Sequence, residues 1–160
     1  MATTTTTGSR YRTATGQATL VAFLLVLIFG SPWYARWVDR GHRGIFLETL
    51  AWPRWAFNTN ASFRDLLVTD LKAILVIVFT ALFIALMAGS QLSRARGSVA
   101  AVLIGWGAYI FAAALAALLA SLLLANPSFS TAVIAATAGA AYGLICGWVV
   151  GIATMASRRP

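Results

Sequence analysis

Four long apolar stretches divide the chain, and short polar segments separate them. An apolar α-helix needs about 20 residues to cross the hydrocarbon core of a bilayer, and each stretch can supply that length. The sequence therefore predicts one all-α integral membrane domain over residues 1–160, in which four transmembrane helices form an antiparallel bundle. We expect the spans at about 17–37, 71–90, 99–124 and 131–156.

The first of these spans is the weakest. Its continuous apolar run, Leu20 to Phe29, is short for a bilayer, so the span must include residues on both sides of the run. Pro32 should end or kink this helix, because proline lacks a backbone N–H and clashes with the preceding turn. Residues 1–16 are polar and contain a run of threonines, so we expect a disordered tail there.

The connection over residues 38–62 is rich in tryptophan and arginine, which suit the interface between membrane and water. We expect a short interfacial helix around Ile45 to Ala51, lying on the bilayer and ending before Pro53. The next helix should begin after Ser62, a typical N-cap residue, and residues 63–70 should extend it into the headgroups. The side chains expected to contact the interface or lipid headgroups are Trp33, Trp37, Arg40, Arg43, Trp52, Arg54 and Trp55.

Small residues recur along one face of each of the last two spans. Side chains four residues apart share a helix face, and a row of small ones lets another backbone approach closely. The short turn between the two spans makes them antiparallel, so the simplest arrangement packs the two rows against each other within one chain. The alternative is that the glycine row forms an interface with a partner or a second copy. The rows are Ala135, Gly139, Gly143, Gly147 and Gly151 in the fourth span and Ala108, Ala112, Ala116 and Ala120 in the third.

Charge orients the chain in the membrane. The sequence has 12 lysines and arginines against 4 acids, and its arginine-bearing tail, middle turn and C-terminus fall on one side of a four-span arrangement. The positive-inside rule therefore predicts a multi-pass protein of the cell membrane, with both termini cytoplasmic and residues 38–62 outside. The arginine-rich, alanine-rich composition is typical of a GC-rich, bacterial genome.

The composition excludes several classes of function. A chain that is 60% hydrophobic cannot cover a soluble domain with polar surface. No basic cluster is interleaved with stacking aromatic residues, so we expect no nucleic-acid binding.

The membrane interior offers little chemistry. The apolar interior of each span lacks acidic and basic residues, which pumps and coupled transporters generally need. Cys146 is expected to be a small packing residue, and His42 with Asp39 and Glu48 matches no metal or acid–base motif. We therefore expect no enzymatic activity, no metal and no cofactor. The polar side chains of the interior are Thr80, Ser90, Tyr109, Ser121, Thr137, Tyr142, Cys146 and Thr154.

Two functions fit this pattern. The first is a small structural or accessory subunit of a membrane protein complex, which packs against other integral membrane subunits, or a second copy, through its small-residue faces and its outer segment. The second is a passive channel, a transporter component or a lipid-handling protein. Both place the chain among lipids.

Overall fold

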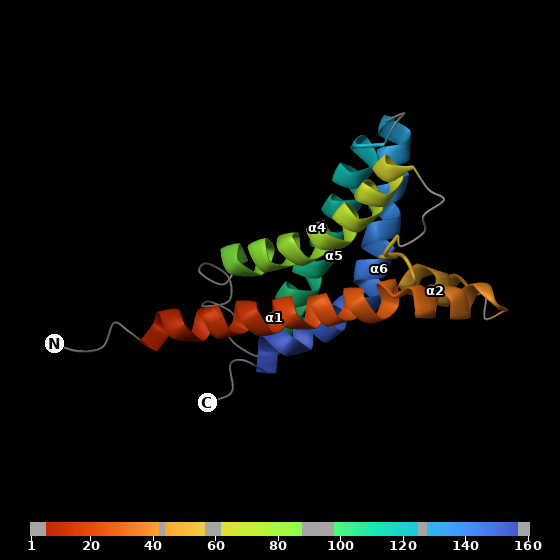
Figure 1. The fold of residues 1–160 in the computed structure, drawn as a ribbon. Helices are drawn as coiled ribbons and strands as arrows, with labels where there is room; N and C mark the ends of the chain where they lie inside the picture. Colours follow the sequence, from red (N-terminus) through yellow and green to blue (C-terminus); the bar gives the residue numbers. More distant parts are fainter. Residues whose placement is uncertain (1–5, 42–43, 57–61, 88–97, 125–127, 157–160) are drawn as a thin grey trace.

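The computed structural model describes residues 6–41, 44–56, 62–87, 98–124 and 128–156, and every regular element in these ranges is a helix (Figure 1). The short interfacial helix and the start of the following helix were predicted within a residue or two. The helices are α1 (Thr6–Gly30), α2 (Pro32–Asp39), α3 (Ile45–Leu50), α4 (Phe63–Met87), α5 (Ser98–Leu122) and α6 (Phe129–Ala156).

Three of these helices are long and apolar enough to cross a membrane, namely α4 from Leu66, α5 from Val99 and all of α6. A fourth crossing requires α1 and α2 to act as one broken span, in which Thr15–Gly30 and Pro32–Asp39 meet at 45°. The chain is therefore a helical, multi-pass membrane protein. The predicted kink at Pro32 is confirmed. Ser31 before it is extended and its Oγ accepts a hydrogen bond from the backbone N–H of Tyr34 (3.2 Å), which begins α2 as a separate helix.

The first helix differs from the prediction at its start. Residues 6–16 are helical, although the polar composition of residues 1–16 indicated a disordered tail. Helix formation is cooperative, so a helix nucleated in the apolar run can extend into residues that would not form one alone. Residues 1–5 lie outside the described part of the chain.

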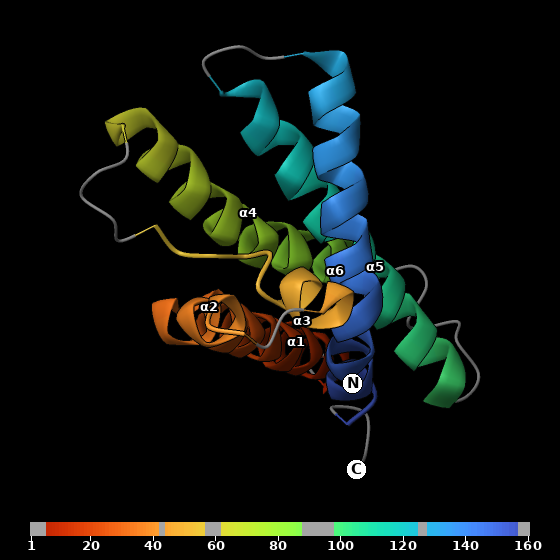
Figure 2. The ribbon, with the colours of Figure 1, turned by 90° about the vertical axis from the view of Figure 1, so that its right-hand side faces the viewer.

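The four long helices form a closed ring of neighbours, in which α1 packs on α4, α4 on α5, α5 on α6, and α6 on α1. The pairing of α5 with α6 is the most extensive, and the two run antiparallel as expected from the short turn between them. In contrast, α1 runs across α6 instead of alongside it (Figures 1 and 2). The four long helices thus form a ring in which α1 crosses α6. Only part of this ring is the predicted antiparallel bundle.

The glycines of α6 let its backbone touch that of α5. A Cβ added at Gly143 would lie 2.6 Å from the Cα of Ile110, and one at Gly147 would lie 2.6 Å from a ring carbon of Trp106. At Gly139 and Gly151 the added atom would collide with backbone carbonyl oxygens of α5. This face of α6 therefore packs within the chain.

The partner face on α5 is not the predicted one. The alanines at 108, 112, 116 and 120 are buried, but the atoms nearest the glycines belong mainly to the adjacent row that includes Trp106 and Ile110. The indole N–H of Trp106 in this row donates to the carbonyl of Leu144 (3.0 Å), which adds a hydrogen bond between the two helices. Ala135, the outermost member of the row on α6, is only half-buried.

Replacing Gly143 by alanine should destabilise the fold by about 1–3 kcal/mol, because the added methyl group forces the two backbones apart. Gly107→Ala on α5 is a matched control, since its Cβ would meet nothing within 4 Å. The free energy of unfolding in mild detergent, measured by titration with dodecyl sulfate, compares the two variants. Equal stabilities would contradict the observed packing.

Candidate functional site

The connection between α2 and α4 folds into the ring of helices. Its short helix α3 packs on α6, and the residues that follow it, Ala51 and Pro53, are almost fully buried. That α3 also lies on the bilayer stays a prediction. The backbone N–H of Trp55 donates to the carbonyl of Gly30 (2.9 Å), and its indole N–H donates to the carbonyl of Val26 (3.3 Å). We call residues 44–56 the outer segment.

Gly30 at the end of α1 makes this insertion possible. A Cβ there would collide with the carbonyl oxygen of Pro53 and would lie 2.9 Å from the indole of Trp55. Only glycine therefore allows the outer segment to pass so close to the end of α1.

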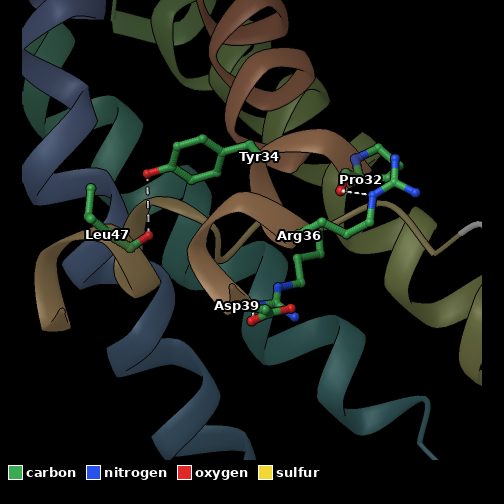
Figure 3. Close-up of polar contacts among 6 residues, drawn as sticks. Pro32, Tyr34, Arg36, Asp39 and Leu47 are labelled. Atoms are coloured by element: carbon green, nitrogen blue, oxygen red, sulfur yellow. Dashed lines mark hydrogen bonds and ion pairs between the residues drawn. The ribbon is translucent and has the colours of Figure 1, made fainter. Parts of the chain in front are cut away.

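Helix α2 supports the outer segment from the other side. Tyr34 points from α2 towards α3, and its hydroxyl donates to the carbonyl of Leu47 at 3.4 Å (Figure 3). Asp39 at the end of α2 pairs with Arg54 of the outer segment at 3.2 Å. Both of these side chains are about half exposed, so the ion pair adds little stability and mainly fixes position.

Lys72 of α4 contacts the outer segment from inside the ring. Its ammonium donates to the backbone carbonyl of Trp52 (3.0 Å) and lies 4.7 Å from the centre of the Trp52 ring. Two residues earlier, Asp70 accepts a hydrogen bond from the backbone N–H of Ala56 (2.9 Å). Side chains of α4 therefore satisfy backbone groups on both sides of Pro53, where the segment is not helical.

A half-open cleft of about 200 Å³ lies beside Lys72, between the beginning of α4, the end of α5 and the beginning of α6. Its walls are largely apolar, and Trp52 lines one side of it. We call it the Lys72 cleft. A second cleft of about 280 Å³ lies between α3 and α6, where Glu48 and Trp52 line it. The indole of Trp52 thus borders both clefts. The walls of the Lys72 cleft include Val68 and Thr69 of α4, Ala120 and Ser121 of α5, and Ala135 of α6.

Beneath Trp52 lies a buried group of polar side chains. The Trp52 ring packs on that of Tyr142, with centroids 5.4 Å apart. The Tyr109 hydroxyl donates a hydrogen bond to the Tyr142 hydroxyl at 3.2 Å. Cys146 is buried on the same helix as Tyr142, so it packs within the protein as the sequence indicated.

The predicted interfacial side chains separate into two sets. Trp33, Trp37, Arg40 and Arg54 are exposed, whereas Trp52 and Trp55 are half-buried within the ring of helices. Arg43, His42 and Ser90 lie outside the described residues.

Sequence reasoning did not single out Lys72, which falls at the beginning of the predicted span 71–90. The available signal was that Lys72 is the single lysine of the chain. It also follows Arg64 and Val68 at intervals of four residues, and residues at this spacing share one face of α4.

No family model, curated protein or solved structure matches this chain. Within the described ranges, no group of three or more His, Cys, Asp or Glu side chains could hold a metal ion. The site is therefore interpreted from its own geometry.

The hydroxyl pair offers a test of the buried group. In Tyr142→Phe the Tyr109 hydroxyl loses its partner in a water-free site, which should cost about 1–3 kcal/mol of unfolding free energy. Tyr109→Phe should cost a similar amount, because the buried Tyr142 hydroxyl then loses the same partner. The double variant should be no less stable than Tyr142→Phe, as measured by unfolding in detergent. Losses that simply add would show that the two hydroxyls act independently.

The insertion of the outer segment can be tested at Gly30. Gly30→Ala should displace the backbone around Pro53 and make residues 44–56 more accessible to protease in detergent. Gly44→Ala is the control, because its Cβ would meet nothing within 4 Å and its φ of −168° is ordinary extended backbone. Equal cleavage rates for the two variants would contradict the close approach at Gly30.

Proposed function

We propose that the protein is a small structural or accessory subunit of a membrane protein complex and catalyses no reaction of its own. The observation that supports this proposal is the ordered outer segment. It is held against the ring of helices by α1, α2 and α4, and together with α2 it carries large apolar side chains on its open side. The exposed fractions are 70% for Trp33, 88% for Ile45 and 58% for Phe46.

Such a surface is suited to binding. Aromatic residues and arginine are enriched at the centres of protein interfaces, and the exposed Arg40 and Arg54 accompany Trp33 and Phe46 here. Because the contacts at Gly30, described above, already hold the segment in place, a partner would not have to supply the free energy of ordering it.

The glycine row of α6 is a weaker candidate for this interface. Its members at 139, 143, 147 and 151 contact α5, so a partner could reach them only by displacing that helix. We therefore assign the partner, another integral membrane subunit or a second copy of the chain, to the outer segment and α2.

The orientation proposed from charge fits the arrangement of the helices. The beginning of α1 and the end of α6 lie towards one end of the molecule, and the beginnings of α4 and α6 lie towards the other (Figure 1). With the arginine-bearing termini in the cytoplasm, the outer segment would face the outside of the cell membrane.

A lipid-handling role is the second candidate, and the Lys72 cleft favours it because it combines one cation with apolar walls. A channel has less support. The buried hydroxyls of Thr80, Ser121 and Thr154 donate to backbone carbonyls, which is how polar groups stabilise helices in lipid.

Purification from the native membrane tests the proposal. Extraction in mild detergent through a C-terminal tag should recover one or more membrane proteins in a fixed ratio. The double variant Trp33→Ala, Phe46→Ala should lose them, because it removes the two most exposed aromatic side chains of α2 and the outer segment. Trp148→Ala is a matched control, since Trp148 is 51% exposed on α6 and belongs to neither the outer segment nor α2.

One combined result would contradict an accessory role. If the tagged protein purifies without a partner and the purified chain alone moves ions or lipids in liposomes, the protein acts by itself.

A further inference from the structure

We propose that the Lys72 cleft binds the phosphate of an anionic phospholipid, with the Lys72 ammonium as its contact. This inference goes beyond an accessory role, which requires no lipid site. It rests on four features: the charge around the cleft, the N–H donors of Lys72 that are not used in the described contacts, the position of the cleft along α4, and its volume.

The charge around the cleft favours an anion. Among the described residues, Lys72 is the only charged side chain that lines it, and the positive charge of Arg54 also acts on Lys72. The nearby carboxylates are engaged elsewhere, since Asp70 accepts from the backbone of Ala56 and Asp39 pairs with Arg54. Glu48 lines the other cleft, beyond Trp52. No described carboxylate therefore forms an ion pair with the Lys72 ammonium.

Lys72 has hydrogen-bonding capacity to spare. An ammonium carries three N–H donors, and the described contacts use one of them on the carbonyl of Trp52. That bond and the Trp52 ring hold the ammonium at the side of the cleft. The remaining donors can bind a phosphate oxygen, and a charge-assisted bond of this kind is about twice as strong as a neutral one.

The position of the cleft favours a lipid as the source of the phosphate. Arg64, Val68 and Lys72 follow one face of α4, so Lys72 lies two turns, or about 12 Å, further along the helix than Arg64. Arg64 is exposed and donates to the carbonyls at the end of α5, at 3.0 and 3.1 Å, which places it at the end of the ring. Each interfacial layer of a bilayer is only about 5–8 Å thick, so Lys72 lies at or just below the inner boundary of that layer. It is therefore next to the layer that holds the lipid phosphates.

The size and walls of the cleft indicate how much of the lipid enters it. A volume of about 200 Å³ is below the range of about 300–1,000 Å³ that holds a drug-sized ligand. It can take a phosphate and the adjoining glycerol, but not the acyl chains. The apolar walls formed by Val68, Ala120 and Leu124 suit the glycerol end, and the acyl chains would remain in the bilayer.

Native mass spectrometry of the full chain in mild detergent tests this site, with phosphatidylglycerol, phosphatidylcholine and inorganic phosphate as separate probes. One phosphatidylglycerol should bind more tightly than phosphatidylcholine, because the choline ammonium is repelled by Lys72 and Arg54. Lys72→Met, which keeps the length of the side chain, should weaken phosphatidylglycerol binding by about tenfold. Ala135→Leu should weaken it similarly by filling the cleft from a half-buried position.

Arg36→Met is the matched control, because it removes one exposed positive charge that does not line the cleft. Its affinity for phosphatidylglycerol should stay within about twofold of the parent protein. Equal binding of the two lipids, or parent-like binding by both cleft variants, would overturn the proposal. So would inorganic phosphate that binds alone and displaces the lipid, since the ligand would then be a soluble anion. None of these results depends on whether a protein partner is found, so the lipid site and the accessory role can fail separately.

Discussion

The close approach of α5 and α6 is the contact on which the other features depend. In a bilayer no hydrophobic force draws two helices together, so their association relies on van der Waals packing and on hydrogen bonds between helices. Glycine at 143 and 147 brings the two backbones together and lets Trp106 reach the carbonyl of Leu144. At that separation the hydroxyls of Tyr109 and Tyr142 meet, and the ring of Tyr142 supports Trp52. The Lys72 cleft is therefore built on the glycine contacts.

A second constraint explains how irregular backbone survives inside the ring of helices. Backbone groups that are shielded from water must find partners within the protein, and residues 51–56 do not form a helix that would supply them. The carbonyl of Trp52 accepts from Lys72, the N–H of Ala56 donates to Asp70, and the N–H of Trp55 donates to the end of α1. Asp70 and Lys72 of α4 thus stabilise residues 51–56, which pass over them.

Local signals in the sequence were enough to predict most of the elements. Pro32 determines the kink, the tryptophan-rich connection contains the short helix, and the apolar lengths give the three unbroken spans. The path of the outer segment was not predictable in this way, because it depends on a contact between Gly30 and Pro53, which are distant in sequence. The rotation of α5 was missed for the same kind of reason. The alanine row suggested a packing face, but the closest contacts with the glycines come from the neighbouring face, where Trp106 also donates to the carbonyl of Leu144.

Lys72 shows why the candidate site was harder to predict than the fold. A lysine near the end of an apolar helix normally extends its ammonium towards water, and the sequence contains nothing that opposes this expectation. The ammonium turns inward because the outer segment places a carbonyl and an aromatic face beside it. Moving Lys72 away would leave the carbonyl of Trp52 without that partner in a site with little water, at a cost of about 1–3 kcal/mol. An anion in the cleft therefore has to bind Lys72 where it already lies, so the protein holds the cation in place before the ligand arrives.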